Sequence, residues 1–348
     1  MKVLAYIKKI QMWKQCLFGL AASFALTACD GIYDDEGDCS TQYSVQFVYD
    51  RNMNFADGFA HAVKRVSLYA FDESGRLVYE KTEAGSALSQ AGYRMNLNDI
   101  EPGTYDFLVW AEGAETDNTF TFPDVQRNVT QLDDLTCYMN REQDAEGNAI
   151  VDHDLVPLFH GIATDQDFTE NPGSERRATV YLTKNTNVVR IVLQHLSGET
   201  VNADDFEFTI TDNNGWMAAD NSLLDDETLT YHAWSVYDGE AALGDDAESE
   251  GITSVGAAIA ELTVGRLMTD HRPILTIRNK SGETILSIPL IDYCLLVKGN
   301  YNRSMSDQEY LDRQDEYNMV FFLDENDRWV NSTIYINSWK VVLGSIEV

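Results

Sequence analysis

Residues 66–75 decide the fold class of the chain; they are Val66-Ser67-Leu68-Tyr69-Ala70-Phe71-Asp72-Glu73-Ser74-Gly75. In the first six, Val66, Leu68 and Ala70 alternate with the residues between them. A period of two places alternate side chains on opposite faces of a β-strand. The Asp-Glu-Ser-Gly sequence that follows is typical of a turn. This stretch therefore predicts a strand that ends in a turn.

The same alternation recurs outward along the chain in both directions. It is found at Val45/Phe47/Tyr49, Tyr105/Phe107/Val109, Val189/Ile191/Leu193, Phe206/Phe208/Ile210, Leu229/Tyr231/Ala233, Leu275/Ile277, Ile285/Leu286/Ile288, Val320/Phe321/Leu323 and in a closing strand from Ile334 to Leu343. Turn signals such as Lys280-Ser281-Gly282 separate neighbouring runs. Many short strands punctuated in this way predict an all-β protein built of β-sandwiches.

Few segments depart from the strand pattern. Asn54–Val63 predicts a short helix, and Ser306-Asp307-Gln308-Glu309 has the spacing of a capping box that would start a polar helix through about Tyr317. The acidic stretch Asp238–Gly251 is weakly patterned, and we interpret it as a loop.

The best candidate linker contains Asn171-Pro172-Gly173-Ser174. It is polar and breaks the strand rhythm. We therefore place an N-terminal β-sandwich at residues 40–164, a linker at 165–175 and a C-terminal β-sandwich at 176–348.

The first 28 residues have the three parts of an export signal. Four lysines make the start positive, an apolar run follows from Cys16 to Leu26, and small residues come next. The run is shorter than the roughly 20 apolar residues that a membrane-spanning helix needs. We expect residues 1–28 to be a signal peptide and not a permanent membrane anchor.

Leu26-Thr27-Ala28-Cys29 resembles a lipobox, where the lipoprotein signal peptidase cuts before a cysteine that becomes acylated. Cys29 is thus the predicted lipidation site, and its lipid would tether the chain to the outer membrane. The alternative is an ordinary secretory signal that happens to end near a cysteine. Residues 29–39 form an acidic tether, which resembles a surface-export signal or is simply a solvated spacer.

The composition excludes some classes of partner. The chain carries 57 acidic and 25 basic residues, for a net charge of −32. Nucleic acid binding requires clustered Lys and Arg that neutralise phosphates, so we expect no nucleic-acid partner. With 44% apolar residues, the chain has far too much hydrophobic content for a disordered acidic stalk.

Residues that carry chemistry are sparse. No H-E-x-x-H, C-x-x-C, G-x-S-x-G or phosphate-binding loop is present in the sequence. His160 is expected to be a strand-end residue bonded to backbone, and Cys137 and Cys294 to be small core residues. A disulfide involving Cys39 and a calcium site at Asp225-Asp226 or Asp245-Asp246 are open alternatives. We predict no enzyme, no catalytic residue, no metal site and no cofactor.

Several segments resemble a known family when taken together in their order. They are Tyr33-Asp34-Asp35, Val45-Gln46-Phe47-Val48-Tyr49-Asp50, Asn52-Met53-Asn54-Phe55-Ala56-Asp57, Val66-Ser67-Leu68-Tyr69-Ala70-Phe71-Asp72, Pro102-Gly103-Thr104-Tyr105, Pro157-Leu158-Phe159-His160-Gly161, Tyr310-Leu311-Asp312-Arg313-Gln314 and Ile336-Asn337-Ser338-Trp339. The series is similar to the fimbrial anchor subunits of Bacteroides-like bacteria, the FimB-type and minor-fimbrium anchor lipoproteins.

The resemblance implies a fold and a function. The fold would be two transthyretin-like β-sandwiches in tandem. The function would be that of a lipid-anchored, surface-exposed subunit at the fimbrium base, which attaches the shaft, limits its length and pairs with a shaft subunit by β-strand addition. A surface lipoprotein that binds glycan or host protein is the alternative, followed by a fimbrial tip subunit and by a hydrolase.

Overall fold

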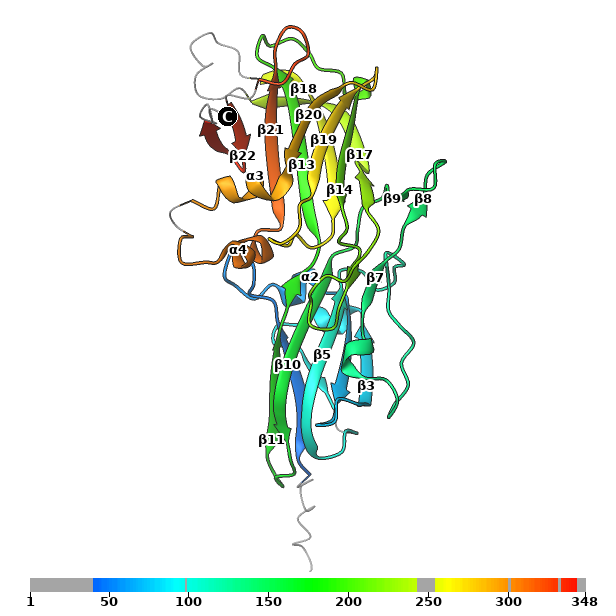
Figure 1. Ribbon diagram of the computed structural model, residues 1–348. Helices are drawn as coiled ribbons and strands as arrows, with labels where there is room; N and C mark the ends of the chain where they lie inside the picture. Colours follow the sequence, from blue (N-terminus) through cyan, green and yellow to red (C-terminus); the bar gives the residue numbers. More distant parts are fainter. Residues whose placement is uncertain (1–39, 98, 243–253, 300–301, 331–332, 343–348) are drawn as a thin grey trace, which may run out of the picture. The chain divides into compact units, whose positions relative to one another are not determined.

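The computed structural model describes residues 40–97, 99–242, 254–299, 302–330 and 333–342 (Figure 1). These residues form mainly β-strands arranged in several sheets, so the all-β prediction is confirmed. Cys29, Cys39, Asp245-Asp246 and Leu343 lie outside the described residues. Among the described helices, none is both long and apolar enough to cross a membrane.

One group of strands builds the first core. Its members are β1 (Gln42–Val48), β2 (Arg65–Phe71), β3 (Leu77–Ala84), β4 (Arg94–Asn96), β5 (Gly103–Glu112), β10 (Leu158–Phe168), β11 (Glu175–Tyr181) and β12 (Thr183–Lys184). They form a three-stranded sheet of order β11-β1-β4 and a five-stranded sheet of order β12-β10-β5-β2-β3. Both sheets contribute to one apolar cluster, for example through Phe47 of β1 and Leu68 of β2.

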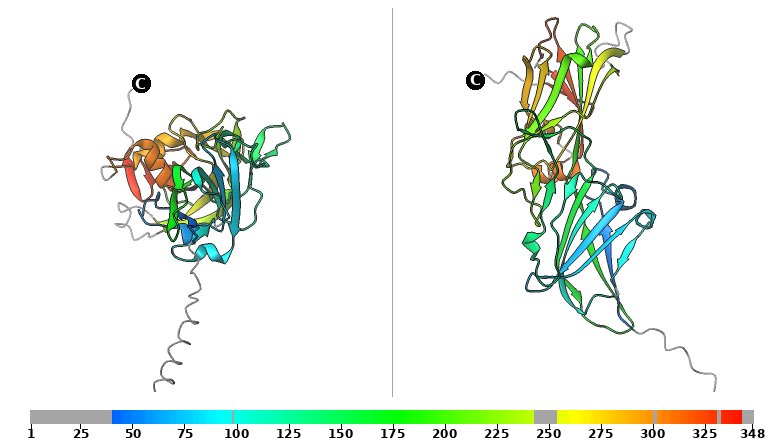
Figure 2. Two further views of the ribbon diagram at one scale, coloured as in Figure 1. Left: turned by 90° about the horizontal axis from the view of Figure 1, so that it is seen from below. Right: turned by 90° about the vertical axis from the view of Figure 1, so that its right-hand side faces the viewer.

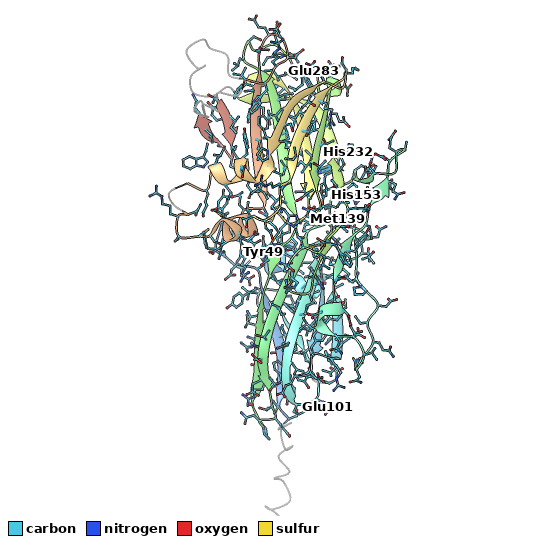
Figure 3. The ribbon with its side chains drawn as sticks, viewed as in Figure 1. Tyr49, Glu101, Met139, His153, His232 and Glu283 are labelled. Carbon is cyan, nitrogen blue, oxygen red and sulfur yellow. The ribbon has the colours of Figure 1, made fainter. Side chains whose placement is uncertain are left out.

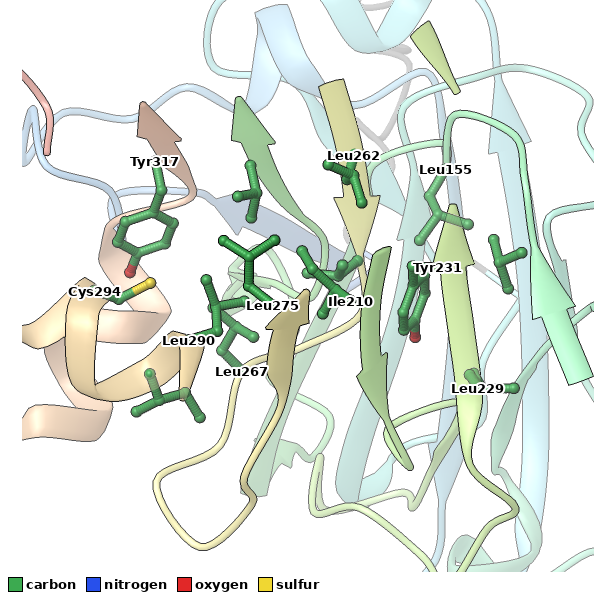
Figure 4. Close-up of a cluster of buried hydrophobic side chains, with 14 of the residues drawn as sticks. Leu155, Ile210, Leu229, Tyr231, Leu262, Leu267, Leu275, Leu290, Cys294 and Tyr317 are labelled. Carbon is green, nitrogen blue, oxygen red and sulfur yellow. The ribbon is translucent and has the colours of Figure 1, made fainter. Parts of the chain in front are cut away.

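A second group of strands builds the larger core. Its members are β8 (Glu142–Gln143), β9 (Ala149–Val151), β13 (Asn187–His195), β14 (Phe206–Asp212), β16 (Leu229–His232), β17 (Ser235–Ala242), β18 (Ser254–Val264), β19 (Ile274–Asn279), β20 (Thr284–Pro289), β21 (Glu316–Leu323), β22 (Thr333–Ile336) and β23 (Trp339–Val342). They form two six-stranded sheets, β17-β18-β13-β21-β22-β23 and β20-β19-β14-β16-β9-β8. Figure 4 shows Ile210 and Leu262, one from each sheet, in their shared core.

The part of the chain that the structure describes also contains a small sheet and three short 3-10 helices. The sheet has the order β15-β7-β6, with β6 at Phe120–Thr121, β7 at Cys137–Met139 and β15 at Trp216–Met217. The 3-10 helices are η1 (Ser86–Ser89), η2 (Leu132–Asp134) and η3 (Ala203–Asp205).

The stretch that predicted the fold class forms the strand and turn expected of it. Val66, Leu68 and Ala70 are fully buried on one face of β2. In the turn, Gly75 adopts φ +74°, a conformation that favours glycine, and its N–H donates to the Asp72 carbonyl over 2.8 Å. The local sequence therefore determines both the buried face of β2 and the turn that follows it.

Within the described residues, the α-helices are α2 (Phe59–Ala62), α3 (Leu290–Leu296) and α4 (Asp307–Arg313). α2 lies inside the predicted helical segment. Ser306 caps α4 as predicted, because its hydroxyl oxygen accepts from the Glu309 N–H at 3.0 Å. The predicted extension to Tyr317 is wrong, since Glu316 already begins β21.

Strand pairing departs from the predicted segment limits. Residues 165–168 were assigned to a linker, but they continue β10 beyond a register shift between Ala163 and Gln166. Asp165 lies in this irregularity with φ +56°, and its N–H donates to the Asp106 carboxylate at 2.8 Å. The break in strand rhythm was therefore a β-bulge, which inserts an unpaired residue into a continuous strand.

Two other strand assignments also differ from the sequence interpretation. β9, in the predicted N-terminal segment, pairs in parallel with β16 of the larger core. Residues 238–242 of the acidic stretch belong to β17 and not to a loop, because they pair with β18 through Ala242. Residues 243–251 of that stretch lie outside the described residues.

The described residues fall into two compact units of very different size. Residues 40–42 and 170–175 belong to the small one, in which the Gln42 N–H donates to the Ser174 carbonyl at 3.0 Å. There the Asn171 N–H also donates to the Thr41 hydroxyl at 2.8 Å. The other described residues belong to the large unit, which contains the groove described below.

Candidate functional site

A groove opens beside α3 and α4, where the β22–β23 hairpin and the loop after β1 come together. Figures 1 and 2 show the orange helices next to the red hairpin strands. The groove has a volume of about 640 Å³. It is lined by Met53, Phe55, Leu296, Val297, Lys298, Gly299, Asn302, Tyr310, Gln314, Asn337, Trp339, Lys340 and Val341.

Three large apolar side chains of this groove are exposed. Trp339 is 62% exposed, Phe55 58% and Leu296 45%. A single exposed apolar residue is ordinary, whereas several gathered around one hollow are typical of an interaction site. We therefore take the groove, defined by its thirteen lining residues, as the candidate functional site.

Phe55 is held in an unusual backbone conformation. Its φ of +52° is left-handed, which is rare for a bulky residue. Asn52 stabilises the loop, since its side-chain amide donates to the carbonyls of Tyr49 at 2.9 Å and Ala56 at 2.8 Å. The Arg313 guanidinium lies 4.8 Å from the centre of the Phe55 ring. The loop thus fixes an exposed aromatic ring in place.

Trp339 is presented by a tight hairpin turn. The prediction of one closing strand from Ile334 to Leu343 is wrong, because the described residues there form two antiparallel strands, β22 and β23. Asn337 and Ser338 between them have φ of +48° and +68°, the pattern of a two-residue type I′ turn. Asn337 secures the turn through its side-chain oxygen, which accepts from the Asn318 N–H at 2.7 Å. The reversal leaves Trp339 exposed opposite the buried Ile336.

Helix α4 forms the buried side of the groove. Tyr310 is only 2% exposed, and burial raises the pKa of its hydroxyl to about 12. Asp312, on the same helix, is held by a bidentate ion pair with Arg266, whose guanidinium nitrogens lie 2.9–3.0 Å from the carboxylate. Because such a pair fixes geometry as well as charge, it sets the position of the helix.

Helix α4, which lines the groove, also contacts the first core. Figure 3 shows Tyr49 of that core beside α4. Arg313 of α4 donates to the Asp50 carbonyl at 3.0 Å. Burial and the nearby Asp315 carboxylate raise the pKa of the Tyr49 hydroxyl, and Asp315 also pairs with Lys184 at 2.6 Å. The residues just before Phe55, Tyr49 and Asp50, are therefore held in place by contacts with α4.

The charge of the groove differs from that of the chain. Its lining contains Lys298 and Lys340 but no Asp or Glu, although the sequence has 57 acidic residues. Lys298 is oriented by hydrogen bonds to the Met305 carbonyl at 2.6 Å and the Asp307 carboxylate at 2.7 Å. The positive charge of Lys298 is therefore already compensated by the Asp307 carboxylate beside the groove.

The sequence-predicted residues lie elsewhere. His160 is buried, and its Nε2 donates to the Ala219 carbonyl at 2.8 Å, which confirms a structural histidine. Cys137 and Cys294 are buried free thiols, and burial raises the pKa of both. Asp226 pairs with Arg141 at 2.8 Å. In the described part of the chain, no three His, Cys, Asp or Glu side chains gather as metal ligands.

Burial lowers the pKa of His160 to about 4, from an ordinary value near 6.5. Between these pH values the unfolded state binds more protons than the folded state, so the free energy of unfolding falls as the pH is lowered through that window. Relative to His160→Gln, which retains an N–H donor, the wild type should lose about 3 kcal/mol more stability between pH 7 and pH 4. Urea unfolding at several pH values measures this difference, and parallel curves for the two proteins would contradict it.

The comparisons with known proteins identify a family for this fold. Residues 35–344 match the family described as fimbrillin-A associated anchor proteins Mfa1 and Mfa2. The chain belongs to this family. The resemblance seen in the sequence is thereby confirmed, and no curated protein sequence matches the chain.

Solved structures of related proteins share the fold. A candidate adhesin from Bacteroides thetaiotaomicron is 34% identical with a TM-score of 0.74, over 87% of this chain and 98% of its own. A candidate polysaccharide-binding protein of the same organism is 30% identical with a TM-score of 0.73, over 88% and 99%. The fimbrial anchor protein Mfa2 from Porphyromonas gingivalis is 17% identical with a TM-score of 0.62, over 87% and 99%, which shows the fold alone. These relatives are described as fimbrial, adhesin or polysaccharide-binding proteins, and not as enzymes.

Sequence reasoning on this member of the anchor family missed the groove. Phe55 lies in a polar stretch, and Asn337-Ser338 divides an apolar run with residues that tolerate positive φ. The polar residues around Phe55 and the turn-forming pair before Trp339 each indicated an exposed aromatic residue next to a turn. What the sequence alone could not supply was that Phe55, Leu296 and Trp339, which are distant along the chain, line one groove.

Proposed function

We propose that the chain is a non-catalytic outer-membrane lipoprotein that serves as an anchor or accessory subunit of cell-surface fimbriae. The observation that carries this proposal is the anchor-family match over residues 35–344, which begins just behind the lipobox cysteine Cys29. In this role the lipid on Cys29 holds the chain at the cell surface, and the folded part attaches the shaft and limits its length.

The proposal includes the way in which the subunits join. Under this proposal the chain contains two transthyretin-like β-sandwiches in tandem, and a shaft subunit pairs with it by β-strand addition. The two larger apolar clusters, each formed between two sheets, support the first part. Strand addition forms main-chain hydrogen bonds along a sheet edge while alternate side chains enter pockets beneath it. Among the described strands, β23 and β17 are the outer members of one six-stranded sheet and are suited to this kind of pairing.

Replacing Cys29 with alanine tests the anchor function. Without the acylated thiol the protein loses its membrane tether, so fimbriae should be shed into the medium or grow abnormally long. Immunoblots of cell and medium fractions, together with electron microscopy, measure both effects. Cys39→Ala is the matched control, since it removes a nearby cysteine that no lipobox precedes. Fimbriae that stay attached at normal length, while the Cys29→Ala protein leaves the membrane, would refute the anchor function.

A second candidate function is capture of a glycan at the cell surface. It is favoured by the exposed rings of Phe55 and Trp339, and by the relative described as a candidate polysaccharide-binding protein. Exposed aromatic rings can stack on the apolar faces of sugar rings. Binding of purified protein to immobilised bacterial and host polysaccharides, lost on Trp339→Ala, would support this function.

A further inference from the structure

We propose that β1, the first described strand after the tether, is a mechanical clamp: a strand that resists being pulled out of its sheet when the fimbrium is under tension. This inference rests on the proposed anchor function, because a subunit held by the lipid on Cys29 carries the tension between the membrane and the shaft. It follows from the place of β1 in its sheet, the contacts of its side chains and the ends at which tension enters.

β1 is the central strand of its sheet, with β4 on one side and β11 on the other. At the start of β1, the Gln42 N–H donates to the Ser174 carbonyl at 3.0 Å. At its end, the Val48 carbonyl accepts from the Leu182 N–H at 2.8 Å. The starts of β1 and β11 are thus adjacent, and so are their ends, which makes the two strands parallel.

The side chains of β1 prevent it from sliding along its neighbours. The ring centres of Tyr43 and Phe168 lie 5.4 Å apart, and those of Phe47 and Phe59 lie 5.5 Å apart. Val45, between the two β1 rings, is fully buried in the same core. A slip of one residue would turn all three side chains toward the opposite face of the sheet. β1 therefore does not yield by small steps.

Tension enters β1 and the larger core at opposite ends of the strand. Cys29 precedes β1 in the sequence, so a pull from the lipid reaches the start of β1. The larger core holds the other end, since Arg313 of α4 donates to the Asp50 carbonyl at 3.0 Å. It also holds the chain just after β11, where Lys184 pairs with Asp315 at 2.6 Å. A shaft that pairs with β17 or β23 of the larger core therefore pulls along β1 and not across it.

The direction of the pull decides how the hydrogen bonds break. Tension along β1 loads the bonds to both neighbouring strands together, so they must break almost at once. Tension across the strand opens them one after another from the end, which needs much less force. Resistance to such forced unfolding is governed by the unfolding rate, and not by the free energy of unfolding.

Single-molecule force spectroscopy on residues 29–348, produced without lipid, tests the clamp. One handle is attached to Cys29 in a Cys39→Ser background, in which the two remaining cysteines are buried. The second handle is attached through Tyr181→Cys at the exposed end of β11, or through Pro172→Cys in the exposed turn before its start. Because the strands are parallel, the first pull shears β1 against β11, whereas the second peels the two strands apart.

The rupture force of β1 should be several times higher in the shearing geometry than in the peeling geometry. Equal forces would overturn the clamp, and this comparison needs no substitution within β1. Adding Tyr43→Ala should lower the shearing force at which β1 ruptures. The matched control is Phe208→Ala, which removes a buried ring from the larger core and should leave that force unchanged. An equal decrease with both substitutions would also overturn the clamp, because the force would then report overall stability.

The force measurement requires no fimbriae, so it separates this inference from the anchor function. Equal forces in the two geometries, with fimbriae shed by Cys29→Ala cells, would refute the clamp and leave the anchor function intact. A high shearing force, with fimbriae still attached to Cys29→Ala cells, would refute the anchor function and with it the role of β1 under fimbrial tension.

Discussion

Replacing Arg266 with methionine is expected to lower the free energy of unfolding by about 3–5 kcal/mol, a large share of the stability of an ordinary domain. Arg266 and Asp312 are each 11% exposed at their side chains and form a bidentate pair. Arg266 also donates to the Asn221 carbonyl. Its removal leaves the Asp312 carboxylate buried with Gln308 as its remaining described donor. Urea unfolding monitored by circular dichroism measures the loss.

Two further variants show whether the buried charge is the cause. Arg76→Met removes an exposed pair with Asp72 and should cost at most about 1 kcal/mol. The double variant Arg266→Met/Asp312→Leu should recover part of the loss, because both charges are then absent. A double variant less stable than Arg266→Met would show that the pair contributes mainly through its geometry.

Replacing Trp110 with alanine should also cost about 3–5 kcal/mol, because it opens a cavity in the core. Trp110 is 2% exposed, its ring centre lies 4.7 Å from that of His160, and its indole N–H donates to the Leu135 carbonyl at 3.4 Å. The matched control is Trp339→Ala, which removes the same side chain from an exposed position and should change stability by about 0.5 kcal/mol or less.

Thermal or urea unfolding of both tryptophan variants tests this contrast. Equal losses would show that Trp339 is a structural residue and would weaken the case for the groove. A large loss confined to Trp110→Ala would leave Trp339 without a structural role and strengthen that case.

The strands could be predicted from the sequence wherever one face alone is buried. In β2, Val66, Leu68 and Ala70 are fully buried while Ser67 and Tyr69 are only partly so, which is the source of the alternation. The cap at Ser306 was also predictable, because its chemistry is local.

Other features could not be predicted because they depend on contacts between distant segments. The apolar run from Leu290 has no periodicity that separates strand from helix, and it forms α3, which buries Cys294. Figure 4 shows Cys294 close to Tyr317, a residue of β21. Similarly, the bulge at Asp165 resembled a linker because a polar break in the pattern is typical of both.

Of the two candidate functional features, one could be predicted from the sequence and the other could not. Cys29 follows from a short local motif and stays a prediction, since it lies outside the described residues. The groove required the folded chain, because the segments around Phe55, Leu296 and Trp339 meet only through tertiary contacts.

The parallel pairing of β13 with β21 has a consequence for the order in which the protein folds. Eight residues of β13, from Val188 to His195, pair with the segment from Glu316 to Leu323, which lies more than a hundred residues further along the chain. Contacts between such distant segments form slowly because a long loop must close first. The sheet of the larger core therefore cannot close until residues 316–323 have been synthesised. Until then β13 lacks its parallel partner strand, and its unpaired edge is exposed to aggregation.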